Sequence, residues 1–168
     1  MTSPDYKTLF KLQPLFESGS KYLCQQAGII NIFTTQDNFV ELTPRVEIHF
    51  RLKGVDRWGT VIPPMRLVPD AFNAQLIFTV QSDRENNAAT HSVYVSTIMD
   101  TFKNYSVFNE GVLTGSVLKY HRCHDLIFEG VATRTDDLQT GVVDTSVVTY
   151  LLKTNIEPTA WPSGSINN

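Results

Sequence analysis

The chain has 168 residues and a mass of 18.9 kDa, which is enough for one domain with its own core and too little for two ordinary domains. Hydrophobic residues make up 42% and charged residues 18%, so the composition is globular and excludes disorder along the whole chain. The formal net charge of −3 argues against a protein that coats duplex DNA, because such a protein needs an excess of lysine and arginine.

The sequence carries no sign of a membrane or an oxidising compartment. Its first residues show no basic flank before an apolar run, and no apolar stretch approaches the roughly 20 residues that a membrane-spanning helix needs. We therefore expect no signal peptide and folding in a cytoplasm. Cys24 and Cys123 are the only cysteines and lie far apart, so we expect two reduced, buried thiols rather than a disulfide.

The opening segment, Asp5 to Gly28, has helical spacing and is predicted to form a helix in two pieces. Pro14 suits the first turn of a helix better than its middle, and Gly19 weakens the continuity of the second piece. Gly28 is the expected stop signal.

The hydrophobic period changes to two from Thr43 onward. Apolar and polar residues alternate from Val46 to Lys53, and the pattern returns from Phe72 to Gln81. Each run predicts a half-buried antiparallel strand. The positions expected to face the core, including two in later strands, are Ile48, Phe50, Leu76, Phe78, Phe128 and Val147.

The segment between these two strands, Gly54 to Asp70, is predicted as a long and unusually apolar loop. Its large apolar side chains include Trp58, Val61, Ile62, Met65 and Leu67. A hairpin loop usually has about two to five residues, and a solvated one does not need so many apolar side chains. Two interpretations stay open: the loop folds back over its own sheet, or it docks on another subunit. We favour docking, because apolar arms suit closed rings in which each subunit contacts the next.

The second half of the chain returns to helical spacing from Ala88 to Asn104, after a predicted turn and cap. One stripe of this helix carries His91, Val95, Ile98 and Phe102. Val117 to Lys153 is predicted to form two or three closing strands, with a polar turn from Thr133 to Gly141. The last residues have no periodicity and contain Trp161.

This order of elements predicts one α+β domain over residues 1–154, in which an antiparallel sheet carries helices packed on one face. Residues 155–168 are predicted to form an extended C-terminal tail.

No group of residues predicts catalysis, and we expect neither an enzyme nor a metal or cofactor site. The densest reactive cluster is His121-Arg122-Cys123-His124, but zinc needs four convergent ligands and a second pair at suitable spacing is missing. In an extended segment neighbours point to opposite faces, which opposes a cysteine–histidine catalytic pair. The basic residues around Trp58 give only a weak nucleic-acid signal.

An N-terminal helix, a first strand that begins with Thr43-Pro44-Arg45-Val46-Glu47-Ile48, a long loop and a second strand over Ala74 to Ser82 follow one another along the chain. A turn and helix over Asp83 to Asn104 and a final strand pair complete the order. Over roughly Leu15 to Lys153, this layout resembles the tail-terminator (tail-completion) proteins of long-tailed bacteriophages. The segment after Lys153 has no counterpart in that family.

The resemblance implies a virion structural protein that assembles in the host cytoplasm into a homohexameric ring. The ring would cap the head-proximal end of the tail tube protein, stop its polymerisation and join the tail to the head–tail connector protein. Genome DNA would pass through its channel without sequence-specific binding, along a wall that the net charge predicts to be acidic. The candidate interface residues are Trp58, Val61, Ile62, Met65, Leu67 and Trp161.

Two alternatives remain beside the terminator. The first is a stopper or adaptor of the head–tail connector (neck), which has a similar size and also assembles into oligomers. The second is a small α+β ligand-binding domain or enzyme with its site in the concave face of the sheet. Apolar residues at the expected inward positions disfavour an enzyme, because catalysis needs converging polar and titratable groups.

Overall fold

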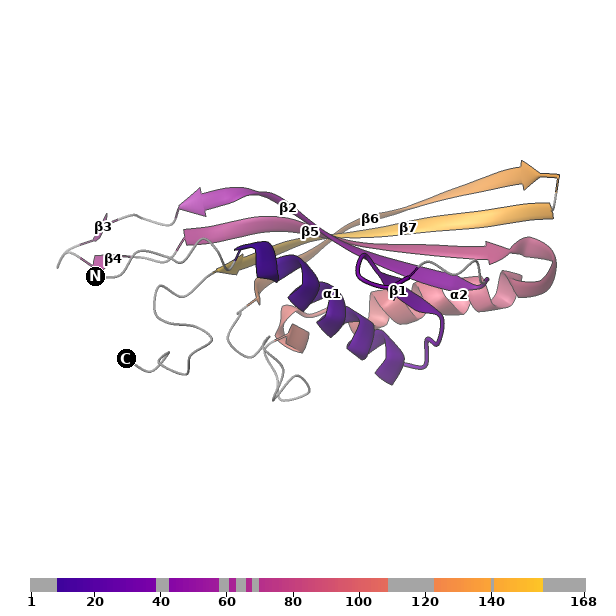
Figure 1. Ribbon diagram of the computed structural model, residues 1–168, viewed down its shortest axis with the longest axis horizontal. Coiled ribbons are helices and arrows are strands. Elements are labelled where there is room, and N and C mark those ends of the chain that lie inside the picture. The colour runs from indigo at the N-terminus through magenta and orange to yellow at the C-terminus, as the bar shows by residue number, and fades with distance from the viewer. Residues whose placement is uncertain are drawn as a thin grey trace.

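A computed structural model describes residues 9–38, 43–57, 61–62, 66–67, 70–108, 123–139 and 141–155. These residues form a five-stranded sheet in the order β1-β2-β5-β7-β6, two helices on one of its faces, and a separate two-stranded ribbon (Figure 1). The α+β class expected from the sequence is confirmed. The expected purely antiparallel sheet is corrected to a mixed one, because its first strand runs parallel to its neighbour.

Helix α1 (Leu9–Gln26) is one continuous helix, so the expectation of two pieces is wrong. It contains Pro14 in its sixth position and also Gly19, which shows that packing on the sheet outweighs both local penalties. The expected stop at Gly28 is confirmed. Gly28 adopts a φ of +98°, which an L side chain disfavours, and the N–H of Ile29 then donates to the carbonyl of Cys24 at 3.1 Å.

Strand β1 (Ile32–Thr34) was not expected from the sequence. It pairs in parallel with residues Val46 to Ile48, and the N–H of Val46 donates to the carbonyl of Asn31 at 2.8 Å. Three residues are too few to show a period, so the sequence pattern cannot separate such a strand from a turn.

Strands β2 (Arg45–Arg57) and β5 (Asp70–Asp83) form a long antiparallel hairpin. Both predicted strands are confirmed, but the predicted loop over Gly54 to Asp70 is wrong in its first part, because β2 continues as far as Arg57. Farther out, β3 (Val61–Ile62) pairs with β4 (Arg66–Leu67). The segment is therefore an extension of the hairpin, and Figure 1 shows it projecting beyond the ends of both helices.

Helix α2 (Arg84–Thr101) follows β5 directly, without the expected turn. Asp83 ends the strand and caps the helix, since its carboxylate accepts the N–H of Glu85 at 3.0 Å. Asn87 departs from helical geometry and kinks the first turns. A short 3₁₀ helix, η2 (Tyr105–Phe108), completes this layer.

Strands β6 (Cys123–Leu138) and β7 (Gly141–Asn155) form the second long hairpin. Both strands run through most of the predicted polar turn between Thr133 and Gly141, because their cross-strand pairing continues as far as Leu138 and Gly141. Near Gly130 the pairing shifts by one residue, which places Val131 on the same face as Phe128. The expected alternation along β6 therefore breaks at this bulge.

The core lies between the sheet and the two helices. The rings of Phe78, Phe102 and Tyr150 contact one another with centroids 4.7 to 6.1 Å apart, and Phe16 stacks on Phe50 at 5.3 Å. Four of the expected inward positions are confirmed as buried: Ile48, Phe50, Leu76 and Phe78.

The two other expected core positions need correction. The row of β7 that faces the helices is Ser146, Val148, Tyr150 and Leu152, so Val147 points to the opposite face. This row was hard to identify because β7 carries apolar residues on both faces. Phe128 lies on the helix side, 5.7 Å from the Tyr150 ring, but remains 46% exposed because β6 is an edge strand.

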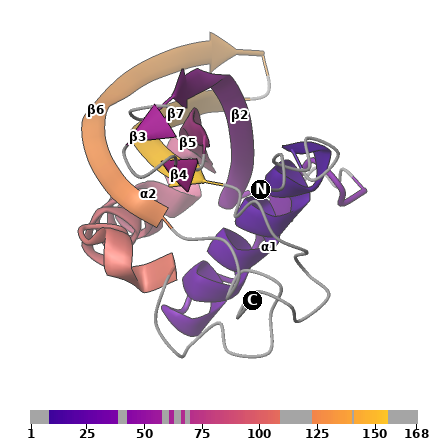
Figure 2. The same cartoon turned by 90° about the vertical axis from the view of Figure 1, so that its left-hand side faces the viewer.

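Figure 2 shows the sheet strongly twisted and rolled, with β2 and β6 on opposite sides and both helices on one face. β7 ends at Asn155, so the predicted tail, Trp161 included, lies outside the described residues apart from Asn155 itself. The first part of the predicted closing strands, from Val117 to Arg122, also lies outside them.

Candidate interaction surfaces

The predicted interface residues fall mainly on the outer part of the β2–β5 hairpin. Val61 and Ile62 form β3, and Leu67 belongs to β4, where Val61 pairs with Leu67. Two adjacent apolar positions and a third that follows them in the chain thus meet in one two-stranded ribbon. Trp58, Met65 and Trp161 lie outside the described residues, so the structure neither joins them to this ribbon nor separates them from it.

The face of the sheet opposite the helices is concave. One hollow on it, of about 470 Å³, is lined from all four long strands, by Glu47 of β2, Thr79 of β5, Val147 of β7 and Arg134 of β6. A second hollow shares Val147 with it and reaches Gln75. The described lining combines threonine, glutamine and charges of both signs with alanine and valine, so this face presents a trough of mixed polarity.

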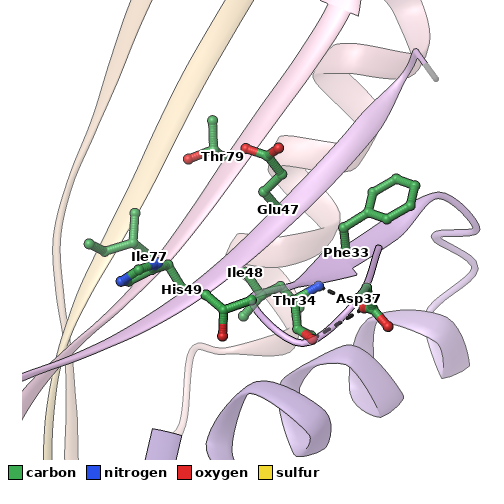
Figure 3. A pocket seen from close by; sticks show the side chains of 9 residues that line it. Phe33, Thr34, Asp37, Glu47, Ile48, His49, Ile77 and Thr79 are labelled. Carbon is green, nitrogen blue, oxygen red and sulfur yellow. Dashed lines mark hydrogen bonds between the residues drawn. The ribbon is translucent and has the colours of Figure 1, made fainter. Parts of the chain in front are cut away.

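A further hollow of about 420 Å³ lies where β1 meets this open face (Figure 3). Figure 3 shows Phe33 and Glu47 on neighbouring strands, with His49 and Ile77 farther along the face. Asp37 accepts the N–H of Thr34 at 2.8 Å and an ion-pair hydrogen bond from Lys21 at 2.9 Å. The hydrogen bond from Lys21, together with that from Thr34, holds the pKa of the Asp37 carboxyl below its usual value.

The two carboxylates that line this hollow both have basic partners. Asp37 is already paired with Lys21, and Glu47 Oε1 lies 3.7 Å from Arg45 Nε. Among the described residues, no group of three or more histidine, cysteine, aspartate or glutamate side chains could hold a metal ion. His121 and Arg122 of the cluster singled out in the sequence lie outside the described part, which includes only the backbone of Cys123 and His124.

A polar chain connects helix α2 to the helix-facing side of β5, β7 and β6. His91 is 8% exposed; its Nδ1 lies 2.6 Å from Ser82 Oγ and its Nε2 lies 2.8 Å from Ser146 Oγ. The Ser146 hydroxyl is in turn 2.9 Å from Thr133 Oγ1. Burial lowers the pKa of His91, while the nearby Asp144 carboxylate opposes that shift.

The same chain places a serine hydroxyl beside an imidazole, as a nucleophile and its base would be placed. Ser82 is fully buried, and Ser146 is only 3% exposed although it lines, with His91, a hollow of about 470 Å³ between α2 and β6. We interpret the chain as a hydrogen-bonded spacer between helix and sheet. A partial signal for it is visible in the sequence, because His91 is a polar residue within an otherwise apolar stripe.

Glu17 closes one side of the sheet. Its side chain is fully buried and accepts the N–H of Phe50 at 2.9 Å and the N–H of Thr35 at 3.0 Å. The carboxylate thus takes the place that a further residue of β1 would occupy beside β2. The sequence contained no sign of this role, because the partners lie 18 and 33 residues away.

β6 forms the opposite side of the sheet and carries exposed apolar residues on both of its faces. Ile127 is 44%, Val131 40% and Leu138 51% exposed, besides Phe128. Among the described residues, no strand pairs with the outer side of β6. An edge strand of 16 residues with these side chains is a surface that natural proteins normally cover.

The thiol of Cys24 is buried beneath α1 and free, as expected. Burial raises its pKa to about 12, so it is a poor nucleophile at neutral pH. The side chain of Cys123 lies outside the described part of the chain. Neither described helix is long and apolar enough to cross a membrane.

Comparisons with known proteins add no functional information to these surfaces. No model of a protein family matches the sequence, and a search of curated proteins gave no match either.

Proposed function

We propose that this chain is a virion structural protein that assembles into a ring and terminates a phage tail tube, as its resemblance to tail-terminator proteins implies. The observation that carries the proposal is the β2–β5 hairpin, which extends beyond the helices and carries three of the predicted apolar interface residues in one ribbon. An arm of this kind has little of its own domain to pack against.

The curvature of the sheet supports a ring. Its open face is concave and carries charged and polar side chains, and both helices lie on the other face. Copies placed side by side with this curvature turn toward the open face, so that face would line the channel and the helices would lie outside. DNA would then pass a wall rich in threonine and glutamine.

In this role the chain contacts further copies of itself in a homohexamer, the tail tube protein and the head–tail connector protein, without catalysis or a cofactor. The acidic channel wall expected from the net charge remains a prediction. The described residues of the open face carry charges of both signs, namely Arg45, Arg51 and Arg134 beside Glu47 and Glu129. A stopper or adaptor of the neck uses the same surfaces and remains the alternative within this class.

The native mass of the purified full chain, measured over a wide concentration range, tests the proposal. We expect a ring species of six subunits, seen also in averaged electron micrographs, and shorter tubes when tail tube protein polymerises in its presence. A chain that stays monomeric at every concentration, alone and beside tubes, overturns the proposal.

The triple variant Trp58→Ser, Ile62→Ser and Met65→Ser tests the arm. We expect it to weaken assembly while thermal unfolding of the monomer stays unchanged. Val93→Ser, on an exposed position of α2, is the control and should assemble normally. Loss of folding in the triple variant would show that the arm packs on its own sheet, the alternative left open by the sequence.

A further inference from the structure

We infer that copies of this chain join edge to edge, with β6 of one copy pairing antiparallel with the part of β2 beyond Phe50 in the next copy. This inference rests on the proposed ring and names the surfaces that form it. Both surfaces lie on this chain, at opposite sides of one sheet.

Within the part of the chain that the structure describes, the outer side of β2 has no strand partner beyond the residues that β1 and Glu17 cover. β1 pairs with β2 only over Val46 to Ile48, and Glu17 takes the N–H of Phe50. Because N–H groups along a strand alternate in direction, the N–H of Leu52 points to the same side as that of Phe50. Leu52 is 42% exposed, and both of its neighbours, Arg51 and Lys53, are exposed.

Strand directions allow the junction without turning a copy over. β2, β5, β7 and β6 alternate in direction, so β2 and β6 run oppositely. A second copy placed beside the first, with its helices on the same face, therefore brings β6 next to β2 in antiparallel orientation. Because each copy contributes four long strands of alternating direction, the alternation continues from one copy to the next.

The register inside one copy predicts which residues meet. Arg51 pairs with Gln75, Gln75 with Leu151 and Leu151 with Ile127, so Arg51 and Ile127 lie at the same level on the open face. If neighbouring copies meet without a shift along the strands, Arg51 of one copy lies opposite Ile127 of the next.

Charge complementarity supports this register. Asp125 and Glu129 stand two positions to either side of Ile127, and Glu129 points to the open face, where Gln75 donates to it at 3.4 Å. In this register the two carboxylates are the diagonal neighbours of Arg51 across the junction, within reach of its long side chain. The basic segment of β2 thus meets the acidic segment of β6.

Covalent trapping tests the register directly. In the full chain with Cys123→Ser, we introduce Arg51→Cys and Ile127→Cys. Within one copy these positions are separated by three strand spacings of about 4.8 Å each, which is too far for a disulfide. We expect a ladder of disulfide-linked oligomers on a non-reducing gel. The matched pair Lys103→Cys and Ile127→Cys should give none.

Charge reversal tests the same contact without cysteines. We expect Arg51→Glu or Glu129→Arg alone to weaken association about tenfold at each junction, because like charges then face one another. An equimolar mixture of the two variants should recover assembly, since every junction of a ring in which they alternate again pairs one glutamate with one arginine. Lys103→Glu and Asp100→Arg, exposed charges on and just after α2, are the controls.

The outcomes separate this inference from the proposed function. A wild-type chain that forms rings while both charge variants assemble normally, or whose cysteine pair yields no ladder, overturns the edge junction and leaves the ring intact. Assembly into dimers through two β6 strands, insensitive to Arg51→Glu, also overturns it. A wild-type chain that never associates overturns both.

Discussion

The two sides of the sheet end in opposite ways. On one side, a three-residue parallel strand and the buried Glu17 carboxylate cover the first part of β2, as far as Phe50. On the other side, β6 presents 16 residues with exposed Ile127, Phe128 and Val131. The first arrangement protects an edge by satisfying its backbone groups, and the second is an edge strand that no other described strand covers.

Because of this difference, the two edges of the sheet are unlike surfaces. If both sides were sealed, sheets could not join, and if both were open, they would join in either orientation and grow without control. One open edge and one partly covered edge favour contacts between unlike surfaces. Such contacts close into rings when the rotation per copy divides the circle.

The largest expected effect is in the core shared by the two sides. Phe78→Ala should lower the free energy of unfolding by about 3–5 kcal/mol, because Phe78 is fully buried against Phe102 and Tyr150. Phe128→Ala, on the open edge, should cost about 1 kcal/mol, since much of that ring is already in water. Urea unfolding of monomeric protein measures both. A near-neutral Phe78→Ala would mean that the helix-covered face is assigned wrongly.

An intermediate effect is expected at the sealed side. Glu17→Ala should cost about 2–4 kcal/mol, because it leaves the buried N–H of Phe50 and the N–H of Thr35 without their acceptor. Amide exchange at these two residues should accelerate more than elsewhere in the sheet. Gln25→Ala, at an exposed position of α1, is the matched control and should change little. Equal stability of the two variants would show that Glu17 does not seal the edge.

The helices and strands that show a long hydrophobic period were predicted well from the sequence. Eight alternating residues from Val46 to Lys53, and a helical stripe through His91 and Ile98, repeat often enough to identify the element and its buried face. Polar turn residues were misleading in β6 and β7, where threonine and aspartate between Thr133 and Asp144 occupy a hairpin that twists away from the core. β-propensity there depends on cross-strand neighbours, which the sequence does not display.

The surfaces that matter for assembly were predictable only in part. The apolar residues of the hairpin extension stand out because a loop does not need them. Glu17 and the exposed apolar residues of β6 do not stand out, because each depends on pairing across many residues of sequence. The bulge near Gly130 also hid the faces of β6, by moving Val131 to the face of Phe128.

The smallest expected effect distinguishes the two sides by pH. On the β6 side of the sheet, His91 connects α2 to the strands. Burial lowers the pKa of His91, so the folded state holds this imidazole neutral between Ser82 and Ser146. Below about pH 6.5, the ordinary pKa of histidine, the unfolded chain binds the proton more readily than the folded chain. Stability from this contact is complete above that pH and declines as the pH falls toward the lowered pKa.

Urea midpoints of the wild type at pH 7.5 and pH 5.0 measure this decline, which His91→Asn should reduce because asparagine does not titrate. His49→Asn, at an exposed position of β2, is the control and should keep the wild-type difference. Amide exchange should show the acid effect in α2 and β7 before it reaches α1 and β1, since the Glu17 contacts do not involve His91. Identical pH dependence in the wild type and His91→Asn would show that the polar chain on the β6 side does not respond to acid.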